Sequence, residues 1–309
     1  MQNLPFFWST KTLILDDDEM FLSELKEVLG NNHNYICFTD PIKAVEYLAK
    51  QDFCLDWYTN GSVTTEEGRG GYNINYNYIP SAILNNNRLN IASNVIVDYN
   101  MPTMSGIAFC KQIEQYRFLR KTLLTSSIES SEAINNLNCQ IINSFIDKRD
   151  ISKKGLLINH IKKQEEIFFA TTGRLVTESL FIENNKHPFL SKEYSAIIRR
   201  ILIDYKIEQY YLVSKSGVYL MIDSDSKEYY VFLLSSDSIK EMSLEAEDNN
   251  LGQEMCDALN NKEKAICFYD KDNTSDWPVF NKWEKYLYPV QSFRINNSEY
   301  YYSIVGKTE

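Results

Sequence analysis

Two patterns of hydrophobic residues alternate along the first half of the chain. Short, mostly apolar runs are followed by longer stretches in which apolar residues return every three or four positions. The short runs are typical of strands covered on both faces, and the longer pattern is typical of helices that cover them. The sequence predicts strands at residues 12–15, 35–38, 94–97, 122–126 and 141–146.

Helices are predicted in the intervals between these strands. The clearest covers residues 19–29, where apolar side chains form one stripe that ends at Gly30. Others are expected from Pro41, near Ser105 and over residues 131–138. Because strand and helix alternate five times, we expect an α/β fold built on a (βα)5, doubly wound parallel sheet with helices on both faces.

The interval from residue 52 to residue 92 breaks this alternation. It is rich in Asn, Gly and Tyr and follows neither pattern. We interpret it as an inserted surface loop. A partner-binding segment is the alternative, because a connection of this length without secondary structure is unusual in a compact domain.

Polar residues of particular types stand at the ends of the predicted strands. Asp16 and Asp17 follow the first strand, Asp98 follows the third, Thr125 lies at the end of the fourth and Lys148 follows the fifth. Because the carboxyl ends of parallel strands meet at one edge of a sheet, we expect these side chains to gather there. Neighbouring carboxylates repel one another, so they either share a proton or recruit a divalent cation, and a site built from oxygen atoms with room for water suits Mg²⁺.

This set of groups suits phosphoryl transfer to a carboxylate. A bound metal can bridge one carboxylate and the phosphoryl group, while a lysine ammonium and a hydroxyl bind the other phosphoryl oxygens. Asp98 is the candidate nucleophile because it ends the central strand. The chain then turns tightly into the next helix through Met101-Pro102 and Ser105-Gly106.

Four segments in this order, LILDDDEMF, VIVDYNMPTMSG, LLTSS and FIDK, resemble the motifs of the receiver domains of bacterial two-component response regulators. The resemblance covers residues 1–150 and implies a flavodoxin-like fold. It also implies that the chain takes a phosphoryl group from a sensor histidine kinase or a phosphotransfer protein.

The same resemblance implies a role for each matching residue at the metal. Asp98 becomes the phosphorylation site. The implied Mg²⁺ is held by Asp16, Asp17, Asp98 and the backbone carbonyl of Asn100, with Asp17 as a direct ligand.

Three further residues match positions that the family uses to switch. The resemblance makes Thr125 the hydroxyl that moves toward the phosphoryl group and Lys148 the lysine that binds it. Phe145 stands where an aromatic side chain turns inward on activation.

The chain departs from the family's pattern in two places. Asp17 and Asp98 lie 81 positions apart (98 minus 17), a wider spacing than the family usually shows, which locates the insertion before the third strand. Arg149 follows Lys148, where the family usually has proline, often after a cis bond. Because a cis bond before any other residue costs about 2.5–4 kcal/mol, we expect a trans peptide here and an altered loop.

Residues 151–208 are predicted to be a helical linker. The stretch 151–170 is either a signalling helix that pairs two protomers or the receiver's own fifth helix followed by a linker. A further helix is expected over residues 191–207, because its apolar residues return at helical spacing.

Residues 209–309 are predicted to form a small α+β domain with an antiparallel sheet. Three strands between residues 210 and 234 indicate a meander, and a helical region follows over residues 237–259. The chain then forms a strand and a final hairpin that turns at Asn296-Asn297. No named output domain matches this part of the sequence.

Composition and charge argue against two classes of protein, membrane proteins and DNA-binding proteins. No apolar run approaches the roughly 20 residues that span a bilayer, and the N-terminus has no cationic start typical of a secretory signal, so we expect a cytoplasmic protein without a membrane anchor. Residues 209–309 hold 10 Lys and Arg against 17 Asp and Glu, a net charge of −7 (10 minus 17), which argues against a DNA-binding surface.

These observations predict a phosphorylation-driven signalling switch rather than an enzyme. The expected output is binding to a partner protein or to a second protomer. Two alternatives stay open for the part after residue 170: an enzyme gated by the receiver, and a small-molecule sensor in which tyrosines of the strands line a pocket. Tyrosines at strand spacing also occur in protein cores, so the tyrosines alone do not decide.

Overall fold

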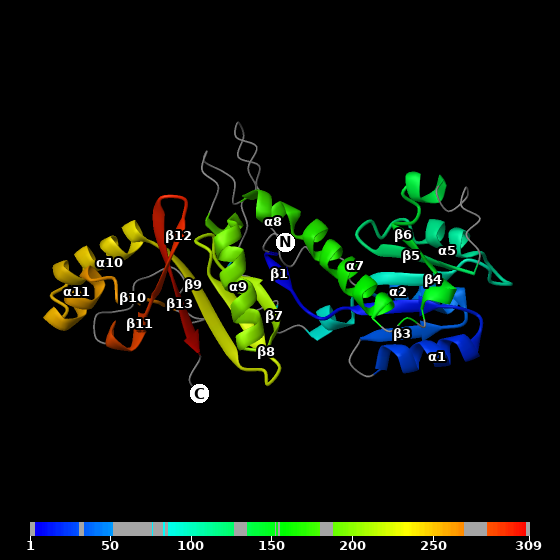
Figure 1. Cartoon of the computed structure of the whole chain (residues 1–309), viewed down its shortest axis with the longest axis horizontal. Helices are drawn as coiled ribbons and strands as arrows, with labels where there is room; N and C mark the ends of the chain where they lie inside the picture. Colours follow the sequence, from blue (N-terminus) through cyan, green and yellow to red (C-terminus); the bar gives the residue numbers. More distant parts are fainter. Residues whose placement is uncertain are drawn as a thin grey trace. The chain divides into compact units, whose positions relative to one another are not determined.

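The computed structural model describes residues 4–30, 34–51, 76, 83, 86–126, 135–151, 153, 155–179, 188–268 and 283–306. These residues divide into two compact units (Figure 1). The parallel-sheet unit holds the described residues from 9 to 51 and from 86 to 174. The antiparallel-sheet unit holds those up to residue 8, those between 56 and 84, and those from 175 onward.

The parallel-sheet unit is built on five strands among its described residues. They are paired in parallel in the order β3-β2-β4-β5-β6. Their bounds are β2 (Lys11–Leu15), β3 (Tyr35–Phe38), β4 (Ala92–Asp98), β5 (Arg120–Thr125) and β6 (Ser144–Asp147). This order confirms the predicted α/β fold with a doubly wound, flavodoxin-like sheet. The strands overlap their predicted ranges, although β6 starts later than predicted.

Helices cover both faces of this sheet. They are α1 (Glu19–Leu29), α2 (Pro41–Ala49), α5 (Gly106–Gln112) and α7 (Leu156–Thr172). One core contains side chains of α2 and α5 with alternate strand residues such as Leu13 and Val97. The other contains side chains of α1 and α7 with the intervening residues, such as Ile14 and Ile96. The period-two alternation of the strands therefore divides the apolar residues between two cores.

Side-chain caps begin three of these helices where the sequence predicted helix starts. The Asp18 carboxylate accepts from the backbone N–H groups of Met20 and Phe21, and Asp40 caps α2 at Ile42. Ser105 caps α5. Such caps satisfy N–H groups that a helix itself leaves unpaired. Of the predicted helix at 131–138, residues 135–138 are helical and the rest lies outside the described residues.

Helix α7 belongs to the parallel-sheet unit. Leu157 and Ile161 lie in the core that α1 also contributes to, and the Arg120 side chain donates to Gln164 at 2.9 Å. Of the two alternatives for this stretch, the packing is that of the fifth helix of the sheet. The structure thus assigns α7 to the first unit, where the sequence predicted a linker, because its apolar stripe is buried against the strands.

The antiparallel-sheet unit contains six strands within the part of the chain that the structure describes, in the order β1-β7-β8-β9-β13-β12. Their bounds are β1 (Phe6–Phe7), β7 (Ile207–Leu212), β8 (Tyr219–Asp223), β9 (Glu228–Ser235), β12 (Gln291–Ile295) and β13 (Ser298–Gly306). The predicted meander and the hairpin at Asn296-Asn297 are confirmed. A separate two-stranded sheet pairs β10 (Lys264–Ile266) with β11 (Leu287–Pro289).

The remaining α-helices among the described residues lie in the second half of the chain. They are α8 (Arg174–Ser179), α9 (Lys192–Asp204), α10 (Ser236–Asp248) and α11 (Gln253–Asn260). The short 3-10 segments are η3 (Asn86–Asn90), η4 (Lys148–Asp150), η5 (Pro188–Leu190) and η6 (Trp283–Tyr286). The single helical region predicted over 237–259 is in fact two helices, because the chain turns at Asn250, which has a φ of 54°. None of the described helices is both long and apolar enough to cross a membrane.

The N-terminal strand β1 lies in the second sheet, whereas the sequence placed residues 1–150 together in the first domain. Phe6 pairs with Tyr211 of β7 and is buried, and the Trp8 ring stacks on that of Tyr211. The Tyr219 hydroxyl also donates to the carbonyl of Leu4 at 2.7 Å. Burial of aromatic side chains holds this segment, although two paired residues are too few to predict a strand.

Most of the predicted insertion at 52–92 lies outside the described residues. The described part near its end contains η3, which leads into β4, and Lys11 donates its backbone N–H to the carbonyl of Ile91 at 2.8 Å. Neither alternative for the insertion is tested.

Candidate phosphoacceptor site

The carboxyl edge of the parallel sheet collects the polar residues that the sequence placed at strand ends. Asp16 directly follows β2, Asp98 is the last residue of β4, and Thr125 is the last residue of β5. Lys148 directly follows β6. Asp98 and Thr125 are buried, and so is Asp16. The edge of the sheet therefore places ionisable groups where little water reaches them.

Lys148 lies between two of these carboxylates. Its Nζ lies 2.7 Å from Oδ2 of Asp16 and 2.8 Å from Oδ1 of Asp98. The lysine side chain is only 22% exposed, and its Nζ also lies 4.5 Å from the centre of the Phe21 ring. One ammonium thus neutralises part of the charge of two buried acids.

The surroundings of these groups change their proton affinities. Burial raises the pKa of the Asp16 carboxyl, so its charged form needs a cation beside it. Burial acts to lower the pKa of Lys148, but its hydrogen bonds to Asp16 and Asp98 outweigh that effect and raise the pKa. Lys148 is therefore firmly positively charged at neutral pH.

Three carboxylates are close enough to share a metal ion. Asp16, Asp17 and Asp98 each offer an oxygen within 4.8 Å of the others. The backbone N–H of Asp18 donates to Oδ1 of Asp16 at 3.0 Å, which holds that carboxylate in place, while Asp17 is exposed. An all-oxygen donor set that is partly open to water fits the preferences of Mg²⁺.

The other predicted site residues lie around this cluster. Asn100 is an exposed residue of the loop after β4. Phe145 pairs with Leu123 across β5 and β6 and packs against the same core as Leu123. Thr125 lies two residues beyond Leu123, so it continues that face of β5 to the edge. Phe145 is thus paired two residues before the carboxyl end of β5, and Thr125 lies at that end.

Gly106 has a structural role here that the sequence indicated only as part of a turn. A Cβ at Gly106 would lie 2.2 Å from the backbone oxygen of Asp98. The backbone N–H of Gly106 donates to the carbonyl of Tyr99 at 3.0 Å, and Tyr99 donates to Leu124 at 2.9 Å. Only glycine lets the start of α5 pass this close to the strand that ends in Asp98.

The peptide bond between Lys148 and Arg149 is trans, as predicted. Arg149 donates its backbone N–H to Oδ1 of Asp147 at 2.8 Å and its side-chain Nε at 3.0 Å. The hydrogen bonds from Arg149 lower the pKa of Asp147 to about 2. The loop that carries Lys148 is therefore held by a pair of charged neighbours instead of a proline ring.

Comparison with solved structures places the fold in a known class. The parallel-sheet unit has the flavodoxin-like fold of receiver domains. The chain as a whole is similar in fold to the response regulator LqsR of Legionella pneumophila, with 23% sequence identity and a TM-score of 0.76 over 99% of this chain and 89% of LqsR.

Two further structures match with lower scores. The signal receiver domain of an HD-domain-containing protein from Pseudomonas fluorescens Pf-5 is 17% identical, covers 55% of this chain and 96% of its own, and has a TM-score of 0.38. An adenylate cyclase from Rhodopirellula baltica is 16% identical over 54% of this chain and 94% of its own, with a TM-score of 0.37. At TM-scores this low, neither match bears on the function of this chain. No protein-family model and no curated protein matches the chain.

Proposed function

We propose that the chain is a response regulator of a two-component phosphorelay in which Asp98 accepts a phosphoryl group. The observation that supports this proposal is the convergence of Asp16, Asp17 and Asp98 with Lys148 at the carboxyl edge of a doubly wound sheet. The phosphoryl donor is a phosphohistidine of a sensor histidine kinase or a phosphotransfer protein.

The transfer step follows from the chemistry of these groups. An Oδ of Asp98 attacks the phosphorus atom, the phosphorus–nitrogen bond of the phosphohistidine breaks, and the imidazole nitrogen takes up a proton. Asp16, Asp17 and the carbonyl of Asn100 would hold Mg²⁺ beside Asp98, where the ion offsets the charge of the phosphoryl oxygens. Lys148, which already lies 2.8 Å from Asp98, exchanges this contact for one with a phosphoryl oxygen.

The switch then involves Thr125 and Phe145. The Thr125 hydroxyl lies at the end of β5 and donates to the new phosphoryl group, and Phe145 repacks against the core. Rearrangement of these two side chains changes the surface that the unit offers to a partner.

The output is an interaction rather than a reaction. Residues 209–309 carry a net charge of −7 (10 basic minus 17 acidic residues), which disfavours contact with DNA phosphates. We therefore propose that the antiparallel-sheet unit binds a partner protein or a second protomer when Asp98 is phosphorylated.

Incubation of the full-length chain with acetyl phosphate and Mg²⁺, read by intact mass, tests the proposal. Wild type should gain one phosphoryl group, and Asp98→Asn should gain none. Asp150→Asn removes a carboxylate that lies outside the cluster and should label like wild type, and EDTA should prevent labelling. A wild type that binds Mg²⁺ but gains no phosphoryl group would contradict the proposal, as would equal labelling of Asp98→Asn.

A further inference from the structure

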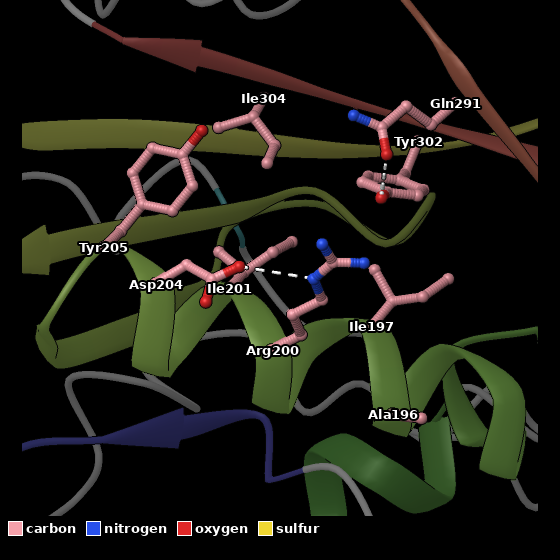
Figure 2. A pocket seen from close by; sticks show the side chains of 9 residues that line it. All are labelled: Ala196, Ile197, Arg200, Ile201, Asp204, Tyr205, Gln291, Tyr302 and Ile304. Atoms are coloured by element: carbon pink, nitrogen blue, oxygen red, sulfur yellow. Dashed lines mark hydrogen bonds and ion pairs between the residues drawn. The ribbon is translucent and has the colours of Figure 1, made fainter.

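The antiparallel-sheet unit contains a cavity of about 320 Å³ between α9 and the hairpin of β12 and β13 (Figure 2). This volume is at the lower end of the range for sites that bind small organic molecules. The cavity lies wholly among residues of the second unit, so its lining does not include the Asp98 site.

One flank of α9 and one face of the hairpin form the walls. Ile197 and Ile201 lie one turn apart on the helix, and Ile304 faces them from β13. Residues 301, 303 and 305 of β13 are buried on the opposite face, while 302 and 304 are only partly buried on the cavity face. The helix therefore leaves Tyr302 and Ile304 partly exposed on this face of the sheet, and Ile304 extends the apolar wall formed by Ile197 and Ile201.

Polar groups line the cavity beside these apolar side chains. Arg200 follows Ile197 by three residues, and Figure 2 shows its guanidinium directed toward Tyr302. The Tyr302 hydroxyl donates to Oε1 of Gln291, its partner across the hairpin, so this bond leaves the Gln291 amide N–H groups for another acceptor. Arg200 and Gln291 thus supply two kinds of donor, guanidinium and amide, among the residues that line the cavity.

Arg200 keeps donors available for a ligand. Its Nε donates to Oδ2 of Asp204 at 3.3 Å, one helical turn along α9. This long bond uses one of the five N–H donors of the guanidinium, and the Arg200 side chain is 80% exposed. The terminal nitrogens can therefore form the paired, charge-assisted hydrogen bonds with which arginine binds a carboxylate.

We propose that this cavity binds a small organic carboxylate. Its carboxylate pairs with Arg200 and the Gln291 amide, and its apolar or aromatic body packs over Ile197, Ile201 and Ile304. A single negative charge fits better than a doubly charged phosphate, because Arg200 supplies one positive charge and the carboxylate of Asp204 lies beside it. The antiparallel-sheet unit would then respond to a metabolite, and also to phosphorylation of Asp98 if the proposed function holds.

Fluorine NMR of the full-length protein with 4-fluorobenzoate and 4-fluorobenzyl alcohol tests this proposal. The acid should bind and the alcohol should bind more weakly, because the two probes share a ring and differ in charge. Arg200→Met should weaken binding of the acid by about tenfold or more, the effect of losing a charge-assisted hydrogen bond. Asp204→Asn should strengthen it, because that change removes a competing carboxylate.

Arg199→Met is the matched control. It removes the same charge from the neighbouring position of α9, which does not line the cavity, and should leave the affinity unchanged. Arg199, Arg200 and Asp204 are all exposed, and thermal melts check that each variant is folded. The proposal is overturned if neither probe binds wild type. It is also overturned if Arg200→Met and Arg199→Met weaken binding of the acid equally, or if Asp204→Asn weakens binding of the acid. Those outcomes would leave the proposal for Asp98 intact.

Discussion

Gly106 lies against the backbone of Asp98, where a methyl group in place of its hydrogen would come within 2.2 Å of the Asp98 carbonyl oxygen. The replacement Gly106→Ala must push apart the start of α5 and the end of β4. We expect it to lower the free energy of unfolding by about 1–3 kcal/mol, the usual cost of overpacking. Chemical denaturation measures this loss, and acetyl phosphate labelling should slow in the same variant.

Gly252→Ala provides the control for that prediction. Gly252 is exposed at the start of α11, and a Cβ there would meet nothing within 4 Å. Because Gly252 is the N-cap of α11, alanine there costs at most about 1 kcal/mol, so this variant should lose less stability than Gly106→Ala and should label like wild type. Equal behaviour of the two variants would show that the approach of Gly106 to Asp98 does not matter.

Lys148→Met should separate metal binding from phosphoryl transfer. The ammonium contacts Asp16 and Asp98 at 2.7 and 2.8 Å, so its removal leaves more negative charge for a metal to neutralise. Mg²⁺ affinity, measured by calorimetry, should rise several-fold, while acetyl phosphate labelling should fall. Lys153→Met removes an exposed lysine that pairs with Asp150 and should change neither property. An unchanged Mg²⁺ affinity of Lys148→Met would argue against a metal site at these carboxylates.

Phe6→Ala should destabilise the antiparallel-sheet unit. Phe6 is 1% exposed and belongs to the edge strand β1, which pairs with β7. Loss of a buried phenyl ring costs about 3–5 kcal/mol, which denaturation followed by near-ultraviolet circular dichroism should detect. Phe118→Ala, at a side chain that is 43% exposed, should cost much less. Equal costs would mean that β1 adds little to the second sheet.

His160 should make stability depend on pH. Its Nε2 lies 3.0 Å from Oγ1 of Thr122 and 3.3 Å from Oγ of Ser144. Burial, together with the charges of Lys163 and Arg120, lowers the pKa of this imidazole. The unfolded chain therefore binds a proton more readily than the folded chain, so this contribution to stability is present above a pH of about 6.5 and is lost as the pH falls.

His160→Gln tests this dependence. Urea unfolding at pH 7.5 and 5.5 should show a larger loss of stability for wild type than for the variant, because glutamine does not titrate. His33 and His187 are present in both proteins and cancel in the comparison. An identical loss in the two proteins would mean that His160 titrates alike in the folded and unfolded chains.

The parallel-sheet unit was largely predictable because the signals for its strands, helix starts and site residues lie within short stretches of the sequence. Apolar runs mark the strands, Asp40 and Ser105 mark helix starts, and Asp16 and Asp98 directly follow or end buried strands. In a doubly wound sheet, position at a strand end determines position in space, so the acidic cluster follows from the order of the strands.

Other features depend on contacts between distant parts of the chain. Phe6 joins a strand some 200 positions later, and no local pattern identifies that partner. The cavity beside Arg200 arises because Ile197 and Ile304, far apart in sequence, leave space between a helix and a hairpin. The effect of Gly106 on Asp98 needs the actual approach of two backbones, which spacing alone does not give.

Location of the phosphoryl group within the chain tests the central claim most directly. After treatment with acetyl phosphate and Mg²⁺, borohydride reduction converts an aspartyl phosphate to homoserine, which peptide mass spectrometry can place. We predict that homoserine replaces Asp98 and no other aspartate. Modification of Asp16 or Asp17 instead, or the absence of any reduced aspartate in labelled protein, would contradict the assignment of Asp98 as the phosphoacceptor.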